Sequence, residues 1–229
     1  MKNLRCAVGV ACLLVIAGCG KNTGVGGTAG DATPTTLAAN AEFAKKLNLG
    51  DPQDFDNAKR GFIAKPTGKI VQPDGTVLKD FDAYGFLDGK AADTVNPSLW
   101  RHAQLNANIG LYKVMDGVYQ LRGFDIANMT LIDGKTGWIL VDPLTARESS
   151  KAALEFARQH LGNKPVSAII FTHAHADHYG GILGVTTPEE VAQRKIPIIA
   201  PEGFMEEATS ENVLVGTGMA RRSMYQFGK

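Results

Sequence analysis

Four side chains that can bind a metal ion lie between residues 173 and 178 of this 229-residue chain, where residues 172 to 178 read THAHADH. Imidazole nitrogen and carboxylate oxygen are ligands that suit zinc where no thiolate is at hand. His173 and His175 are two residues apart, so in an extended segment they project to the same side and can bind one ion. Asp177 and His178 can serve a second ion close by.

Two metal ions about 3.5–4 Å apart can share a bridging hydroxide and clamp an oxyanion, which is the chemistry of metal-assisted hydrolysis. Gly180 and Gly181 follow the loop and allow close backbone approach at the entry to the next helix. The alternative is a solvated histidine-rich loop that binds metal only incidentally. The spacing, and the position directly after an apolar strand-like run, favour a two-metal hydrolytic site.

The elements expected around this loop are strands and one helix. Val166–Phe171 is apolar and β-branched, as is typical of a strand covered on both faces, and Ile196–Ala200 is a second such strand. Thr145–His160 is predicted to be an amphipathic helix that Gly162 ends. Further strands are predicted at residues 111–121, broken near 116–117, and in a hairpin of residues 128–132 and 137–141 with Asp133-Gly134 as a two-residue turn.

The flanking segments complete a layered α/β plan. We expect a helix at Leu37–Leu49, loops and short strands over residues 51–97, a short helix around Trp100 and mainly helix over residues 202–227. Antiparallel strands therefore come first, and helices and strands then alternate. This order predicts helices packed on mixed sheets.

The N-terminus has the pattern of an export signal. Lys2 and Arg5 precede an apolar run over residues 6–16, which is too short to span a bilayer comfortably. Small residues before Cys19 resemble a lipobox, so we expect Cys19 to be lipidated, with a plain secretory signal as the alternative. Gly20 after it favours the outer membrane, and therefore a periplasmic protein anchored by lipid.

Cysteine and charge exclude several classes. The three cysteines all lie within the first 19 residues, so neither a disulfide scaffold nor a thiolate metal site is expected in the folded part. The formal net charge of +1 gives no reason to expect nucleic acid as a partner. Residues 20–36 are rich in Gly, Thr and Ala and read as a flexible tether.

The metal loop resembles the His-x-His-x-Asp-His signature of the metallo-β-lactamase superfamily. Seven further blocks resemble its alkyl sulfatase branch, from about residue 54 onwards. These blocks are 54–64 (DFDNAKRGFIA), 94–101 (TVNPSLWR), 122–125 (RGFD), 128–130 (NMT), 137–138 (GW), 142–145 (DPLT) and 200–206 (APEGFME).

The resemblance implies an αβ/βα sandwich of which only the N-terminal part is present. On this basis the chain divides into a lipoprotein signal peptide (1–18), a flexible tether (19–36), an N-terminal extension (37–109) and an incomplete metallo-β-lactamase-like domain (110–229). It also implies that full-length proteins of the family form homodimers.

The implied activity is zinc-dependent hydrolysis of linear primary alkyl sulfates, such as dodecyl sulfate, to an alcohol and sulfate. Two Zn²⁺ ions would occupy a complete site, His173 and His175 binding one and Asp177 and His178 the other. Asp177, with a metal-bound water, would be the catalytic group. Asp142 would support the loop from beneath, and Thr172 would order it by a backbone hydrogen bond.

The family completes its site with two glutamates and a further histidine, which are expected beyond residue 229. The chain alone is therefore expected to show no useful sulfatase activity. The later glutamates lie too near the motif to be those ligands; they are Glu189, Glu190, Glu202, Glu206, Glu207 and Glu211. The competing hypotheses are another hydrolase of the superfamily, acting on a lactone, thioester or phosphodiester, and a non-catalytic metal-binding lipoprotein.

Several other side chains have both a functional and a structural interpretation. Five residues could contact a sulfate, although each is also typical of surface or capping positions: Arg122, Asn128, Asn212, Arg221 and Arg222. Trp100 and Trp138 are expected in the core. His102 and His160 have no partner at a metal-binding spacing and are expected on the surface.

Overall fold

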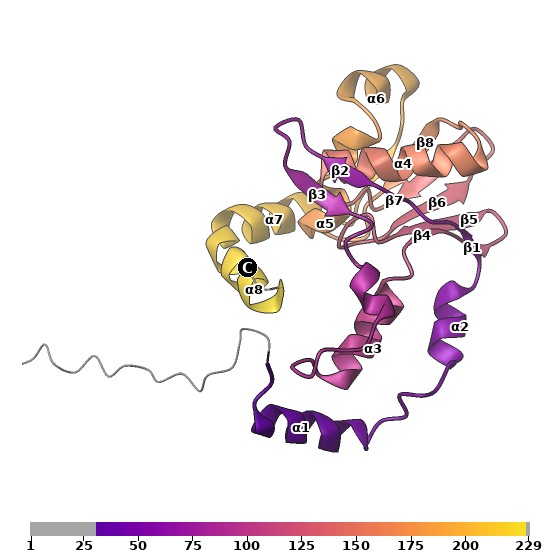
Figure 1. Ribbon diagram of the computed structural model, residues 1–229. Helices are drawn as coiled ribbons and strands as arrows, with labels where there is room; N and C mark the ends of the chain where they lie inside the picture. Colours follow the sequence, from indigo (N-terminus) through magenta and orange to yellow (C-terminus); the bar gives the residue numbers. More distant parts are fainter. Residues whose placement is uncertain (1–30, 228–229) are drawn as a thin grey trace, which may run out of the picture.

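The computed structural model describes residues 31–227, and in it helices pack on a seven-stranded mixed sheet (Figure 1). The expected signal peptide, Cys19 and most of the expected tether lie outside the described residues. The strands follow the spatial order β1 (Phe62–Ala64), β4 (Gly110–Met115), β5 (Val118–Arg122), β6 (Met129–Asp133), β7 (Trp138–Val141), β8 (Val166–Ile170) and β9 (Ile198–Ile199). A separate hairpin pairs β2 (Lys69–Val71) with β3 (Val77–Asp80).

The sheet changes from antiparallel to parallel at the strand that precedes the long helix. Neighbouring strands from β1 to β7 are antiparallel, whereas β8 runs parallel to β7 and β9 runs parallel to β8. A parallel pair needs a crossover connection, and helix α4 (Arg147–Leu161) supplies it between β7 and β8. The α/β class predicted from the element order is confirmed.

Short helices surround the sheet. They are α1 (Pro34–Ala44), α2 (Gln53–Lys59), η1 (Gly85–Asp88), α3 (Pro97–Asn106), α5 (Ala176–Tyr179), η2 (Ile182–Gly184), α6 (Pro188–Arg194), α7 (Phe204–Thr209), the π-helical turn η3 (Ser210–Leu214) and α8 (Gly216–Phe227). In Figure 1, α7 and α8 (yellow) extend away from the sheet beside α5. None of the helices within residues 31–227 is long and apolar enough to cross a membrane.

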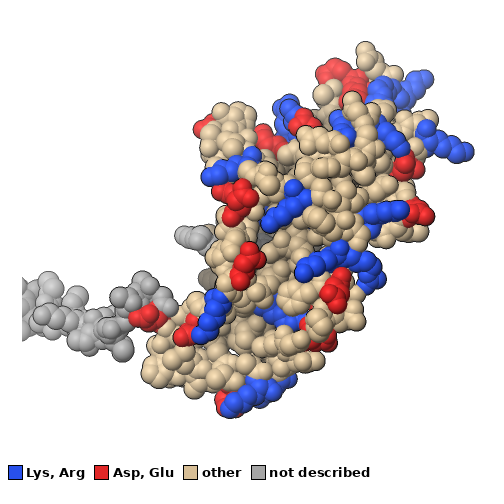
Figure 2. Space-filling model, turned by 45° about the vertical axis from the view of Figure 1, so that its right-hand side comes forward, with Lys and Arg blue, Asp and Glu red and all other residues tan. Residues whose placement is uncertain are grey.

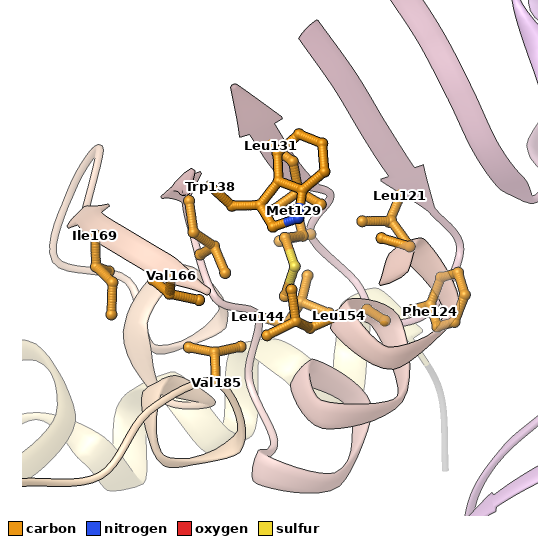
Figure 3. Close-up of a cluster of buried hydrophobic side chains, with 14 of the residues drawn as sticks. Leu121, Phe124, Met129, Leu131, Trp138, Leu144, Leu154, Val166, Ile169 and Val185 are labelled. Carbon is orange, nitrogen blue, oxygen red and sulfur yellow. The ribbon is translucent and has the colours of Figure 1, made fainter. Parts of the chain in front are cut away.

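The core lies between one face of the sheet and helix α4 (Figure 3). Leu131 and Leu140 are cross-strand partners and are fully buried, and Leu154 of α4 packs into the same cluster. Trp138 is 1% exposed, which confirms its predicted core position, while Trp100 is only half-buried. Full burial of a leucine contributes roughly 1.5–3 kcal/mol, so this layer fixes the strand ends that carry the metal loop.

Two strand predictions need correction. Val166 and Ile169 are buried but Ile170 is only half-buried, so β8 is fully covered on one face and not on both. Ile198 and Ile199 are 43% and 52% exposed, because β9 is an edge strand paired only with β8. Apolar composition indicated strands at both places, but it does not reveal how the other face or edge is covered.

The hairpin connection is longer than predicted. Asp133 pairs with Trp138, so the connection consists of residues 134–137. The prediction of a two-residue turn at Asp133-Gly134 is therefore wrong. The Gly134 N–H donates to the carbonyl of Gly137 at 3.0 Å. A Cβ on Gly137 would lie 2.2 Å from the carbonyl oxygen of Pro165, so the close approach of β7 to the segment before β8 requires glycine here.

The N-terminal region differs from the expectation at two points. Helix α1 begins at Pro34, inside the segment expected to be a flexible tether, because the Thr33 side chain caps it and proline is favoured in the first turn. Helix α2 was not predicted, because Gly and Pro recur throughout the following residues.

In the face seen in Figure 2, basic and acidic side chains are interspersed, so no extended field of one sign covers it.

Candidate metal centre

The metal loop leaves the carboxyl end of β8 and enters the short helix α5. Because β7 and β8 are parallel, their carboxyl ends lie at the same edge of the sheet, where side chains from both can meet. Asp142 follows β7 and Thr172 follows β8 by two residues, and the two side chains are hydrogen-bonded. The sheet therefore brings together a supporting carboxylate and a histidine-rich loop that are distant in sequence.

Asp142 is the buried support of the loop. Its carboxylate accepts hydrogen bonds from the Thr172 N–H at 2.8 Å, from the Thr172 hydroxyl at 2.7 Å and from His178 Nδ1 at 2.8 Å. Only 6% of Asp142 is exposed, and its φ of 57° lies in the left-handed region that Asp tolerates better than most residues. Asp142 therefore lies beneath the metal loop, and its role in orienting a metal ligand stays a prediction.

The contact with Asp142 determines which nitrogen of His178 is free. A carboxylate only accepts, so Nδ1 carries a proton, and in the neutral ring Nε2 then has a bare lone pair. That Nε2 lies 3.3 Å from Oδ2 of Asp177, which is also an acceptor. Two acceptors at this distance repel each other unless a proton or a metal ion lies between them, so in the neutral form this pair offers two donor atoms to a metal ion.

The four predicted ligands form two pairs rather than one cluster. His173 Nε2 lies 3.0 Å from His175 Nδ1, and the Asp177–His178 pair is at 3.3 Å. Two donor atoms on a tetrahedral zinc ion lie about 3.3 Å apart when the metal–nitrogen distance is about 2.0–2.1 Å. The ring centroids of His173 and His178 are 4.0 Å apart, so the two pairs are neighbours.

These pairs fit a divalent ion, but each supplies only two ligands. Within residues 31–227 no group of three or more His, Cys, Asp or Glu side chains surrounds one metal position. Closed zinc sites usually have four ligands. The assignment of His173 and His175 to one ion, and of Asp177 and His178 to another, remains a prediction that the pairing of these side chains favours.

Glycines and a second carboxylate fix the backbone around the loop. A Cβ on Gly181 would lie 2.2 Å from the carbonyl oxygen of Pro143, so the turn after α5 can pack on the segment after β7 only with glycine. Asp125 accepts hydrogen bonds from the backbone N–H groups of Thr145 and Ala146 and from the Ser149 hydroxyl. Asp125 therefore fixes the segment that leads into α4, which has no side-chain cap.

Beside the loop lies a cavity of about 730 Å³, which His173 and His175 share with α7, η3 and α8. Glu211 of η3 lies in it, and its Oε1 is 3.2 Å from Nε2 of His175. Glu211 is close to the motif in the chain, so the sequence did not point to it as a partner of the metal loop. No periodicity marks it, since the contact depends on how the chain folds back after α7.

The five residues considered for sulfate contact lie in different parts of the structure, and one of them lines the cavity beside the metal loop. Arg222 lines the cavity with His173 and His175. Asn212 instead donates to the Tyr179 hydroxyl at 3.1 Å, and Arg221 is exposed outside the cavity lining. Arg122 and Asn128 line a different cavity of about 870 Å³.

Arg122 also makes contacts within the fold. Its side chain donates to Gln120 at 2.7 Å and lies over the ring of Tyr112. The two remaining histidines are not near the loop: His160 packs against Phe156, and His102 lies in α3. Both are exposed and lie in helices, as expected.

Comparison with known proteins identifies one superfamily and several similar enzymes. The sequence model of the metallo-beta-lactamase superfamily matches residues 122–227. Over 198 residues, 86% of this chain, the sequence is 50% identical to an (R)-specific secondary-alkylsulfatase from Pseudomonas sp.. Over 204 residues, 88% of the chain, it is 47% identical to a linear primary-alkylsulfatase from Pseudomonas sp..

The structural comparison gives the same relationship. The solved structure of the stereoselective inverting sec-alkylsulfatase Pisa1 from Pseudomonas sp. superimposes with a TM-score of 0.81 over 86% of this chain, at 50% identity. That match covers 31% of the solved chain, and this chain spans 30% of the length of both curated relatives. The matched region includes the metal loop and the strands that carry it.

Proposed function

Because the chain belongs to the metallo-β-lactamase superfamily and shares 47–50% identity with alkylsulfatases, we propose that it provides the metal-binding loop of an alkyl sulfate ester hydrolase. The observation that carries the proposal is the pairing of the loop's donor atoms at distances that fit a metal ion. The sequence blocks around the metal loop resemble alkyl sulfatases, and these relatives are alkylsulfatases. Linear primary and secondary alkyl sulfates are both candidate substrates.

Zinc is the proposed ion, because the donors are imidazole and carboxylate without thiolate. When bound, zinc would supply Lewis acidity and activate water for attack on the ester at neutral pH. Asp142 holds His178 with Nε2 directed toward Asp177. Thr172 donates to Asp142, which fixes the start of the loop.

Arg222 is the proposed contact for the sulfate group. It is the only Lys or Arg among the described residues that line the cavity beside His173 and His175. A guanidinium presents a planar set of donors that matches the oxygens of a tetrahedral oxyanion. Val215 and Met219 line the same cavity and give the alkyl chain an apolar surface next to the reacting ester.

A chimera tests the activity. The matched segment of the (R)-specific secondary-alkylsulfatase would be replaced by the corresponding segment of this chain, and sulfate release from dodecyl sulfate and from 2-octyl sulfate would be measured. We expect hydrolysis of at least one ester, its loss in His173→Ala, and its retention in His102→Ala. A folded chimera that cleaves a lactone or a phosphodiester but neither sulfate ester would contradict the proposal.

The chain by itself is a second test. Since the described residues provide two ligands to each ion, we expect purified protein to take up zinc weakly and to release no sulfate at a measurable steady rate. Sustained sulfate release by the 229-residue chain would show that four ligands are sufficient. The variant His178→Ala should then abolish the release.

We further propose that the chain is exported and lipidated at Cys19, which would place it in the periplasm at the outer membrane. The support is the sequence of residues 1–20 alone. Labelling with a palmitate analogue in a bacterial host should mark the wild-type chain and not Cys19→Ser, with Cys12→Ser as the matched control. Equal labelling of the Cys19 variant would refute the anchor.

A further inference from the structure

The ring of His175 lies between two partners, one at each nitrogen. Its Nδ1 is 3.0 Å from Nε2 of His173, and its Nε2 is 3.2 Å from Oε1 of Glu211. The first partner is a predicted metal ligand in the same loop. The second belongs to η3, the π-helical turn between α7 and α8, and π-helical turns are frequent at functional sites.

The protons on His173 can be assigned from its neighbours. The Thr172 hydroxyl has a single hydrogen and donates it to Oδ2 of Asp142, at 2.7 Å. Toward Nδ1 of His173, at 2.9 Å, the hydroxyl must then accept, so Nδ1 of His173 carries a proton. In the neutral ring Nε2 of His173 is therefore bare, and it is this atom that faces His175.

The neutral ring of His175 has two tautomers, and they differ in the atom that faces this bare nitrogen of His173. If its proton sits on Nδ1, His175 donates to His173, and the pair closes with a hydrogen bond that leaves no room for a metal ion. If its proton sits on Nε2, two bare nitrogens face each other at 3.0 Å, an arrangement that a cation resolves. The carboxylate of Glu211 can only accept, so it stabilises the second state.

We propose that Glu211 is a positioning residue that holds His175 in the Nε2-protonated tautomer and so keeps Nδ1 open for the metal ion. The proposal rests on the proposed metal centre. Glu211 is not placed as a ligand of the ion shared by His173 and His175, because it contacts the ring nitrogen that does not face His173.

The surrounding contacts hold Glu211 in place. The adjacent Asn212 donates to the Tyr179 hydroxyl at 3.1 Å and to the Ala208 carbonyl at 2.8 Å. Tyr179 in turn packs edge-on against Phe204, at 5.1 Å between ring centroids. These contacts tie η3 to the helix that follows the metal loop. The side chain of Glu211 is 26% exposed, so its carboxylate is partly shielded from water.

The tautomer can be measured directly on the metal-free protein. Long-range ¹H–¹⁵N NMR at about pH 8, where an ordinary histidine is neutral, reports which nitrogen of His175 carries the proton. We expect the Nε2-protonated form in the wild type, its loss as the dominant form in Glu211→Ala, and its retention in Glu211→Gln, whose amide oxygen still accepts. Glu202→Ala, an exposed glutamate before α7, is the matched control and should not differ from the wild type. An unchanged tautomer in folded Glu211→Ala would overturn the proposal.

Zinc affinity provides the second readout, by competition with a chromogenic chelator. Loss of a group that orients a ligating histidine typically costs about 10–100-fold in affinity, so we expect that loss in Glu211→Ala and less than about 10-fold in Glu211→Gln. Equal losses in both variants with an unchanged tautomer would make Glu211 a ligand instead and refute the positioning role. A wild type that binds no zinc would refute the metal centre, while the tautomer measurement would still decide the role of Glu211.

Discussion

Asp142→Asn is the substitution that tests the support of the metal loop most directly. Asn has nearly the same shape as Asp and tolerates the φ of 57° at this position, so the backbone should stay in place. One oxygen can still accept from the Thr172 N–H. The amide group that replaces the other oxygen cannot accept from the Thr172 hydroxyl or from His178 Nδ1.

The magnitude follows from those two lost hydrogen bonds. Each hydrogen bond to a charged group contributes about 1.5–3 kcal/mol, so we expect Asp142→Asn to lower the free energy of unfolding by about 3 kcal/mol or more. At about 2–4 °C per kcal/mol for a domain of this size, the melting temperature should fall by about 6–12 °C. His178 also loses the acceptor that fixes its tautomer, so zinc affinity should fall by about 10–100-fold.

The assay combines calorimetry on the metal-free chain with a zinc competition titration. Asp116→Asn is the matched control, because Asp116 is an exposed turn residue that contacts only Lys113; it should change neither quantity appreciably. If folded Asp142→Asn binds zinc as tightly as the wild type, then Asp142 does not orient His178 for metal binding. An unchanged melting temperature would show that the two lost hydrogen bonds contribute nothing net to stability.

Three further substitutions test other parts of the site. Gly181→Ala places a Cβ 2.2 Å from the Pro143 carbonyl oxygen, so we expect a loss of about 3 kcal/mol in thermal unfolding; stability within about 0.5 kcal/mol of the wild type would refute this close packing. Asp125→Ala removes the hydrogen bonds that fix the segment leading into α4 and should lower the free energy of unfolding in urea by about 1–2 kcal/mol; an unchanged value would show that these hydrogen bonds contribute nothing net. Arg222→Ala in the chimera should raise KM for alkyl sulfate about 10-fold, as expected for one lost charge-assisted contact, whereas Arg221→Ala should not; equal effects would remove Arg222 from the proposed sulfate contact.

The order of elements could be predicted because it depends on local patterns. Alternating and β-branched runs indicated the strands, and the amphipathic pattern ended by Gly162 indicated α4. The coverage of those strands could not be predicted, since an apolar run reads the same in a central and in an edge strand. β9 is the example: Ile198 and Ile199 are apolar but exposed, because the described chain places no strand beyond them.

The chemistry of the metal loop follows from its amino-acid types and their spacing. The residue types at 173, 175, 177 and 178 define the donor atoms, and spacing in a short segment controls which side chains can share an ion, since both are local properties.

The residues around those donors depend on the fold. It brought Asp142 under His178, placed Glu211 against His175, and put Arg222 rather than Arg221 in the cavity. Each of these contacts joins segments that the parallel strand pair or the turn after α7 brings together. Contacts between distant segments leave no periodic pattern in the sequence, because they depend on how elements pack and not on which residues are neighbours in the chain.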